Sequence, residues 1–497
     1  MKRFFGIVAA LVAILTFAGI SLTSVVGCGG GSTPTPTPTP PTTIFPNDQS
    51  LAQSPPVKLG TSGGNANDLG TKVCCIGTLG SLWTKTGLTG PVILSNNHVL
   101  AGSDNGKELP GSAINQPLQL ACTAPTAPAP QTVAHLTQAA ALKPVSNETT
   151  QPCAGDASKA ALCGHAPSNV DAAIAQVVSG EVDASGTILD LGPVGTSSIS
   201  PAPPSATIGT AAIGEAVSKS GRTTGLTCST IQSLNNTILI DYVATCGDTT
   251  AAFTAYFTNQ VTISGGTFSS GGDSGSLIVD TNTARPVGLL YGGNTVSTVA
   301  NPIQDVITAF GGPAAFTIVG GADHTVSCAH QASASATQVG TTQAALVPAE
   351  RQRVTTVQKA RAQSLMRDFG FASVEVGSSA DNPSEGALLL HVTGKSAPAV
   401  PAVIDGVRTR LVFDNPAAQM PTVSAQQIAQ ATAVKEAHVP DFLGKGIQGV
   451  GVAISSDNPG EMAIALHVIK GQAHPAIPAV IDGIRTKVFE GTQFKPY

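Results

Sequence analysis

The sequence predicts an all-β domain that is followed by a tandem repeat of smaller α+β units. Through the first two thirds of the chain, apolar residues occur in short runs that are broken by Gly, Thr, Asn and Pro and that lack helical periodicity. Such runs are typical of a β-sandwich or a pair of β-barrels, and the roughly 250 residues that contain them suit two six-stranded barrels. The runs cover residues 73–79, 92–94, 172–178, 238–243, 253–263, 277–279 and 287–291.

Composition and charge exclude one class of partner. The chain has 497 residues, of which 42% are hydrophobic and 11% are charged, and this allows full cores in two or three domains of about 100 to 200 residues each. The net charge is -5 and the basic residues do not cluster. Because nucleic-acid binding needs a basic surface, we expect no nucleic-acid partner.

Residues 1–27 are expected to be a signal peptide. A basic start, Lys2 and Arg3, precedes an apolar segment, residues 4–18, that is too short for a comfortable membrane span. Residues 25–28, Val-Val-Gly-Cys, resemble the site at which bacterial lipoproteins are cleaved and acylated. Cys28 is therefore the expected lipidation site and the bilayer an expected partner. Ordinary cleavage nearby, which would leave a secreted protein with a free Cys28, is the alternative.

Residues 28–66 are predicted to be a linker. Thr and Pro alternate over residues 33–41, and such a stretch cannot build a core because Pro has no backbone donor. A chain of this kind is extended, at about 3.1 Å per residue. It would hold the following domain, residues 67–320, away from a bilayer.

Residues 269–276, Ser-Ser-Gly-Gly-Asp-Ser-Gly-Ser, contain a candidate nucleophile. Gly272 and Gly275 let the backbone turn its N–H groups toward a developing oxyanion, while Ser274 presents its hydroxyl at the end of a buried strand. A polar turn between two strands is the alternative interpretation. The choice depends on whether a base and an acid occur upstream.

Both occur upstream, in a definite order. His98 follows an apolar strand, and Asp171 opens another one. The order His98, Asp171, Ser274 is that of the chymotrypsin-like serine peptidases, and residues 221–225, Gly-Arg-Thr-Thr-Gly, resemble a segment of the bacterial alpha-lytic and streptogrisin members. The resemblance spans roughly residues 67–310. It implies a double six-stranded barrel with His98 and Asp171 in the first barrel and Ser274 in the second.

The resemblance implies a serine endopeptidase that acts on proteins or peptides without a cofactor or a metal. Ser274 would attack the peptide carbonyl, His98 would take and return the proton, and Asp171 would hold the imidazole. The backbone N–H groups of Gly272 and Ser274 would bind the oxyanion. His165 is the alternative base, although no strand leads into its position.

Two further sets of residues follow from the resemblance. Asp273 is a buried acid in the family, and Arg222 is its expected ion-pair partner. The residues expected around the substrate pocket carry no charge, so we predict cleavage after small or medium apolar residues. These residues are Phe268, Tyr291, Gly292 and Gly293.

The cysteines favour an exported protein. Nine are present, and setting Cys28 aside leaves an even number that could form up to four disulfides. Members of the family pair the equivalent of Cys228 with a cysteine where this chain has Ser218, so Cys246 would be a new partner. No Cys-x-x-Cys or His-Glu-x-x-His spacing occurs, and no zinc site is expected.

The tail contains an internal repeat with a period of about 76 residues. The copies are predicted to be α+β modules, residues 340–416 and 417–497, that pack against each other. His391 and His467 lie at equivalent strand positions and could suggest a paired metal site, but repetition alone explains their placement. Neither copy has a nucleophile with a base. Their Pro and Ile-Asp-Gly segments are similar to segments beside some bacterial trypsin-like domains, and this resemblance implies a folding or inhibitory accessory.

Two functions remain open. The first is an endopeptidase that is lipid-anchored at the cell envelope, and the alternative is a binding or scaffold lipoprotein that retains the peptidase fold. The joint presence of His98, Asp171, Ser274 and Gly272 favours the enzyme, because a binding module has no physical need for all four. No function is predicted for the insert of residues 102–168.

Overall fold

The structure is a computed structural model that describes residues 48–68, 76–102, 108–117, 130–145, 168, 170–195, 198–244, 248, 250–328, 346–394, 396–415 and 422–497. The predicted signal peptide, Cys28, most of the predicted linker, His165 and Cys246 lie outside these residues. Within the described ranges, no helix is long and apolar enough to cross a membrane.

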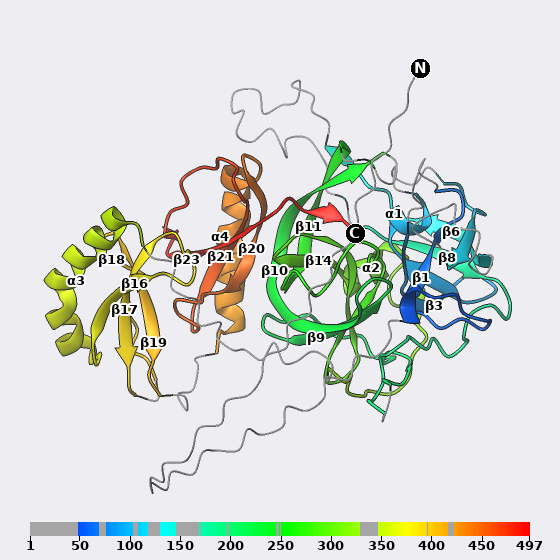
Figure 1. The fold of residues 1–497 in the computed structure, drawn as a ribbon, viewed down its shortest axis with the longest axis horizontal. Coiled ribbons are helices and arrows are strands. Elements are labelled where there is room, and N and C mark those ends of the chain that lie inside the picture. The colour runs from blue at the N-terminus through cyan, green and yellow to red at the C-terminus, as the bar shows by residue number, and fades with distance from the viewer. Residues whose placement is uncertain are drawn as a thin grey trace, which may run out of the picture. The chain divides into compact units, whose positions relative to one another are not determined.

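An eight-stranded sheet forms the first half of the all-β domain (Figure 1). Its core is one apolar cluster in which Trp83 stacks on Phe316 with ring centroids 4.5 Å apart. The helix α1 (Asn97–Leu100) follows β4 directly. In sheet order the strands are β15 (Phe316–Ile318), β3 (Ser81–Lys85), β4 (Val92–Ser95), β8 (Ala173–Val177), β6 (Gln131–Ala139), β5 (Ala113–Gln116), β1 (Thr61–Asn65) and β2 (Gly77–Leu79). A 3₁₀ turn, η1 (Asp48–Ser50), precedes β1.

The second half is a closed barrel. Its strands pair in the order β10, β9, β12, β13, β14 and β11, and the pairing of β10 with β11 closes the ring. The long strands β10 and β11 form a hairpin, and β7 (Pro144–Val145) adds to the outer side of β11. The bounds are β9 (Ala216–Gly221), β10 (Gly225–Val243), β11 (Ala251–Ser264), β12 (Leu277–Asp280), β13 (Pro286–Gly293) and β14 (Ser297–Pro302), followed by α2 (Ile303–Ala309).

The prediction of an all-β domain is confirmed for these residues, with one difference in the first half. The first sheet has eight strands and not six. One reason is that the chain returns after α2 and adds β15 beside β3. The last strand of the domain, β15, therefore belongs to the first sheet although it follows the second barrel in the chain.

The disulfide partner predicted for Cys228 is wrong. Cys228 bonds Cys328, with an S–S distance of 1.97 Å, and so ties the start of β10 to the segment after β15. Ser218 on β9 lies beside the bridge, with its Oγ 3.2 Å from Cys228 Sγ. In sequence, Cys228 lies near the start of the 19-residue strand β10, and Cys246 follows the end of this strand.

Two α+β modules follow the barrels. Module 1 contains α3 (Pro348–Phe369), β16 (Val374–Ser378), β17 (Gly386–Val392), β18 (Val403–Ile404) and β19 (Val407–Phe413). Module 2 contains α4 (Ala425–Phe442), β20 (Ile447–Ile454), β21 (Met462–Ile469), β22 (Val480–Ile481) and β23 (Ile484–Gly491). The order of elements is the same, and in each module the last long strand runs parallel to the second strand.

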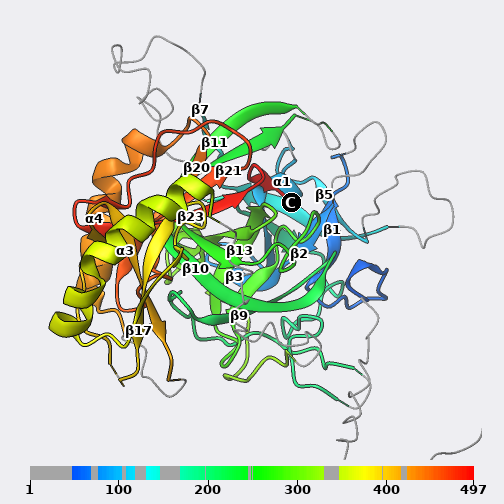
Figure 2. The same ribbon diagram turned by 60° about the vertical axis from the view of Figure 1, so that its left-hand side comes forward.

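Module 2 continues the barrel sheet, whereas module 1 keeps its own four-stranded sheet (Figure 2). The connection is an antiparallel pairing of β20 with β10, for example between Val450 and Thr237. After β23 the chain runs back to the barrel, where β24 (Lys495–Pro496) pairs with β13. The red C-terminal segment in Figure 1 follows this path.

Candidate active site

Ser274 lies in a tight turn between β11 and β12 that requires two glycines. Gly272 has φ +97° and Gly275 has φ +94°, conformations that residues with a Cβ rarely adopt. A Cβ on Gly275 would also lie 2.0 Å from Ser95 Oγ and 2.2 Å from the Thr78 carbonyl oxygen. The turn therefore packs directly against the first sheet, and Ser274 is fully buried.

His98 on α1 and Asp171, just before β8, form a buried pair. His98 Nδ1 lies 2.6 Å from Asp171 Oδ2. Asp171 Oδ1 accepts backbone hydrogen bonds from Asn97 (2.7 Å) and His98 (3.3 Å), which fix the carboxylate. Burial lowers the pKa of His98, but the charge and the hydrogen bond of Asp171 outweigh burial, so the pKa is raised above its ordinary value of 6.5. The protonated imidazole is thereby stabilised.

Two residues that the sequence did not indicate hold Asp171 from the second barrel. Tyr242 donates its hydroxyl to Asp171 Oδ2 at 2.7 Å. Asn301 Oδ1 accepts a hydrogen bond from Asp171 N, and Asn301 Nδ2 donates one to Asp171 O, both at 3.1 Å. Burial and the nearby carboxylate raise the pKa of Tyr242 well above its usual value, so the phenol remains a donor. No sequence spacing relates Tyr242 to Asp171, because they come from different barrels.

Ser274 and His98 meet at the backbone of Tyr497. Ser274 Oγ accepts a hydrogen bond from Tyr497 N at 3.1 Å and donates one to the Tyr291 carbonyl at 3.0 Å. His98 Nε2 lies 3.4 Å from the Tyr497 carbonyl oxygen. In the described part of the chain, no hydrogen bond joins Ser274 Oγ to His98 Nε2 directly. Ser274 and His98 thus both contact the main chain of Tyr497, and Asp171, the third residue predicted from sequence order, holds His98.

The backbone N–H groups of the turn divide into two sets. Asp273 N donates to the Ser270 carbonyl at 3.0 Å, and Gly275 N donates to the Leu290 carbonyl at 2.8 Å. Among the backbone hydrogen bonds of the described residues, neither Gly272 N nor Ser274 N is a donor to a carbonyl group. These are the two N–H groups that are expected to bind an oxyanion, and the hydrogen bonds within the turn do not use them as donors.

Asp273 anchors residues 221–225, but its ion-pair partner is Lys219 and not Arg222. Both side chains of the pair are fully buried, and Lys219 Nζ lies 3.5 Å from Asp273 Oδ2. Asp273 also accepts backbone hydrogen bonds from Thr223 (2.8 Å) and Thr224 (3.1 Å). Arg222 instead donates to Thr223 Oγ1 at 3.2 Å. Side chains of β9 alternate in direction, and that of Lys219 points to Asp273. Arg222 follows the end of β9 and lies in the turn.

The residues predicted to line the substrate pocket lie against the C-terminal segment, residues 495–497. Phe268 belongs to an apolar cluster against which Tyr497 packs. A Cβ on Gly293 would lie 2.5 Å from the Tyr497 hydroxyl oxygen, and one on Gly292 would lie 2.5 Å from the Lys495 carbonyl oxygen. Tyr291 is buried, and its backbone carbonyl accepts a hydrogen bond from Tyr497 N at 3.2 Å.

The two histidines of the tail are not brought together. His391 lies on β17 in the separate sheet of module 1, with Nδ1 2.8 Å from Asp414 Oδ1. His467 lies on β21 in module 2, fully buried, with its ring stacked on Phe489 at 5.1 Å. Within the described ranges, no group of three or more His, Cys, Asp or Glu residues could hold a metal ion.

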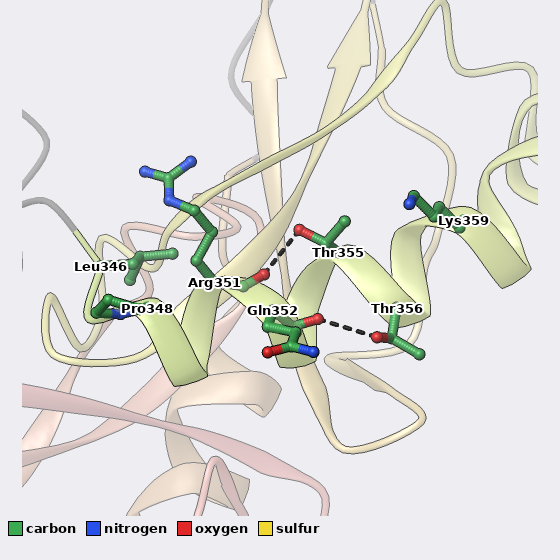
Figure 3. A pocket seen from close by; sticks show the side chains of 7 residues that line it. All are labelled: Leu346, Pro348, Arg351, Gln352, Thr355, Thr356 and Lys359. Atoms are coloured by element: carbon green, nitrogen blue, oxygen red, sulfur yellow. Dashed lines mark hydrogen bonds between the residues drawn. The ribbon is translucent and has the colours of Figure 1, made fainter.

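A hollow of about 460 Å³ lies along α3 in module 1 (Figure 3). Thr355 and Thr356 in its wall donate their hydroxyls back to the carbonyls of Arg351 and Gln352. The lining residues are Leu346, Pro348, Arg351, Gln352, Thr355, Thr356 and Lys359. They include no nucleophile with a base.

Comparison with known proteins gives weak likenesses only. No family model and no curated protein matches the sequence. Among solved structures, the chain is similar to Thermobifida fusca protease A (TM-score 0.32, 15% identity, 53% of this chain and 99% of that one). It is also similar to a Nocardiopsis protease (0.32, 14%, 53% and 98%) and a Cellulomonas bogoriensis chymotrypsin (0.30, 13%, 53% and 97%). These values carry no argument about activity, which rests on the geometry above.

Proposed function

We propose that the chain is an exported serine endopeptidase. One observation carries the proposal: a buried carboxylate orients an imidazole, and that imidazole and a serine hydroxyl in a glycine turn both contact the main chain of one residue, Tyr497. Burying Asp171 beside His98 costs desolvation free energy, and a binding or scaffold protein would gain nothing from this arrangement. The resemblance to chymotrypsin-like serine peptidases at residues 221–225 supports the same assignment.

The proposed mechanism follows from these positions. Ser274 Oγ attacks the carbonyl carbon of the substrate while its proton passes to His98 Nε2, and Asp171 stabilises the imidazolium. The N–H groups of Gly272 and Ser274 bind the oxyanion. His98 then protonates the leaving amine as the C–N bond breaks, and a water molecule hydrolyses the acyl-enzyme by the reverse route. Tyr242 and Asn301 act as positioning residues because they contact Asp171 and not the substrate.

Export and anchoring form the second half of the proposal. The basic and apolar start of the chain supports a secretion signal, and the segment ending in Cys28 supports acylation there. Multiple acyl chains would hold the domain stably at a membrane, whereas one chain binds only marginally. We expect Cys28→Ser to move the protein from the membrane fraction to the soluble fraction, and unchanged membrane association of this variant would contradict the anchor.

Covalent labelling with a fluorophosphonate tests the enzyme assignment. Ser274→Ala should remain folded and lose the label, and its hydrolysis of peptides should fall by a factor on the order of 10⁶. Ser270→Ala is the matched control, because Ser270 lies in the same turn with an exposed side chain. Since the chain's own Tyr497 contacts the nucleophile, both variants are also compared in a background that lacks residues 495–497. Labelling of folded Ser274→Ala would overturn the assignment. Absence of labelling in both the full chain and the variant lacking residues 495–497 would also overturn it.

A further inference from the structure

The C-terminal segment binds the site as an extended peptide. Pro496 and Lys495 pair with Gly292 and Gly293 of β13, and Tyr497 N donates to the Tyr291 carbonyl at 3.2 Å. Addition of a strand to a free sheet edge is a common mode of peptide recognition, in which backbone bonds give affinity and side-chain pockets give specificity. β12 occupies this side of β13 only as far as Leu289, so the edge beyond it is available to a peptide.

Tyr497 occupies the position of the residue that supplies the acyl group. Its N–H contacts Ser274 Oγ at 3.1 Å, and its carbonyl oxygen lies 3.4 Å from His98 Nε2. The proposed nucleophile and the proposed base thus both contact the main chain of this residue. Its side chain must then lie in the pocket that selects the residue before the cleaved bond.

That pocket is built for an aromatic ring with a hydroxyl group. The Tyr497 ring packs against the apolar cluster that contains Phe268, and its hydroxyl donates to the Asn294 carbonyl at 3.1 Å. Burial raises the pKa of Tyr497 to about 12, while a hydrogen bond with Ser269 acts in the opposite direction. The phenol is therefore neutral and hydrogen-bonded, which a small apolar side chain would not achieve.

Gly293 provides the space for this ring. A Cβ at position 293 would lie 2.5 Å from the Tyr497 hydroxyl oxygen and 2.7 Å from Cζ. Real Cβ atoms essentially never make contacts of this length, so a methyl group at position 293 would crowd the ring, and it would also lie 2.7 Å from the Ser297 carbonyl oxygen on β14. The predicted preference for small or medium apolar residues did not include a pocket deep enough for a tyrosine ring.

Module 2 holds the segment in place. Phe494 is fully buried, and its N–H donates to Gln448 Oε1 on β20 at 2.6 Å. The carbonyl of Thr492 accepts hydrogen bonds from Asn294 at 2.9 Å and from Gln448 at 2.8 Å. A tethered peptide competes at an effective concentration set by its tether and not by its amount in solution. Even modest affinity would therefore keep substrate out.

On these grounds, and given the proposed function, we propose that residues 495–497 are an internal, substrate-like inhibitor of the site. We further propose that the substrates are proteins or peptides with tyrosine or another aromatic residue on the acyl side of the cleaved bond. Inhibition and specificity come from the same contacts.

The test compares the full chain with Tyr497→Asp, Tyr497→Phe and a variant lacking residues 495–497. The measurements are the rate of fluorophosphonate labelling and kcat/KM for fluorogenic peptides with Tyr, Phe, Ala, Lys or Glu on the acyl side. Tyr497→Asp and the deletion should raise both rates at least about tenfold, because a charge is poorly bound in an apolar pocket. Tyr497→Phe should remain close to the full chain. Lys470→Ala, an exposed residue of module 2, is the control.

Specificity is tested in the deletion background. Peptides with Tyr or Phe should be preferred over Ala by about 10- to 100-fold, in line with pocket discrimination in other enzymes. Gly293→Ala should remove this preference and retain cleavage after Ala. Preference for Ala in the parent would overturn the aromatic pocket, and equal labelling of the full chain and the deletion would overturn the inhibition.

A binding measurement separates this inference from the proposed function. The deletion variant that also carries Ser274→Ala is titrated with a fluorescent peptide ending in Phe-Lys-Pro-Tyr, and the same peptide ending in Asp is the control. Selective binding of the peptide ending in Tyr, without fluorophosphonate labelling of the full chain or of the deletion variant, would contradict the proposed enzyme activity and support the peptide site. Labelling without selective binding would keep the enzyme and overturn the internal ligand.

Discussion

Modules 1 and 2 share their element order and contact each other reciprocally, yet of their described residues only those of module 2 reach the candidate active site. Asp381 of module 1 accepts a hydrogen bond from Ser456 N, and Asp457 of module 2 accepts one from Ala380 N, both at 2.6 Å. Among the described strands of the two modules, only β20 pairs with the barrel strand β10. Repetition of sequence therefore produces two similar folds, and a few edge residues decide which one docks.

The edge strands differ at one informative position. Gly451 on β20 and Glu375 on β16 are separated in sequence by the same interval as His467 and His391. A Cβ on Gly451 would lie 1.9 Å from Asn236 Oδ1 of β10, so this glycine permits the close approach of the two strands. The exposed Glu375 carries a charge at the corresponding edge, and charges on edge strands oppose pairing with another strand.

The largest effect is expected from exchanging these two residues. Gly451→Glu should disrupt the pairing of β20 with β10 and release Tyr497, because neither the side chain nor its charge fits beside Asn236. Amide hydrogen exchange in β20 should accelerate, and fluorophosphonate labelling should rise by at least about tenfold, toward the rate of the variant lacking residues 495–497.

Glu375→Gly in module 1 is the matched control and should change neither measurement. Wild-type protection of β20 in folded Gly451→Glu would show that the glycine does not decide docking. Faster labelling in Glu375→Gly would show that both modules act on the site.

A smaller and symmetric effect is expected at the interface between the modules. Arg408 donates to the carbonyl of Thr486 at 2.8 Å, and Arg485 donates to that of Thr409 at 2.9 Å. Each guanidinium is buried and pairs with a glutamate whose side chain is about one third exposed. Removing either arginine leaves buried acceptors unpaired, so Arg408→Ala and Arg485→Ala should each lower the free energy of unfolding by about 2–4 kcal/mol.

Denaturant unfolding monitored by circular dichroism measures this loss. Arg485→Lys should restore little of it, because an ammonium group cannot reproduce the forked contacts with Thr409 and the glutamate. A large loss for only one of the two arginines would contradict the reciprocal interface.

The smallest effect concerns pH and the equivalent histidines. Burial lowers the pKa of His467 to about 3 from an ordinary value of 6.5. A lowered pKa means that the unfolded chain binds the proton first, so this residue reduces the free energy of unfolding as the pH falls from about 6.5 to about 3. Asp457 acts oppositely, since burial raises its pKa to about 6.

His467→Phe isolates the histidine contribution. The free energy of unfolding of this variant minus that of wild type should be larger at pH about 4.5 than at pH about 7.5. His391→Phe, at the equivalent position of module 1, is the matched comparison. An identical difference at both pH values would mean that His467 is not buried in the neutral form.

The sequence predicted more of the catalytic turn than of its surroundings. Gly272, Ser274 and Gly275 lie within four residues, so the local sequence predicted the turn and its nucleophile. The order of His98 and Asp171 upstream predicted the base and the acid. Tyr242 and Asn301 could not be found in this way, because they reach Asp171 from strands that are distant in sequence. The ion-pair partner of Asp273 differs from the prediction for a related reason: Lys219 reaches the acid from β9, whereas the family resemblance implied Arg222.

By itself, the sequence determined the features that depend on near neighbours. These are the short strands of an all-β domain, the glycine turn at Ser274 and two copies of a helix followed by strands. Tertiary structure decided what depends on contacts across long separations, such as the bond between Cys228 and Cys328, the docking of β20 on β10 and the placement of Tyr497 at Ser274. The physical reason is that propensity and periodicity act within a few residues, whereas strand pairing and burial depend on which distant edges are free and close enough to meet.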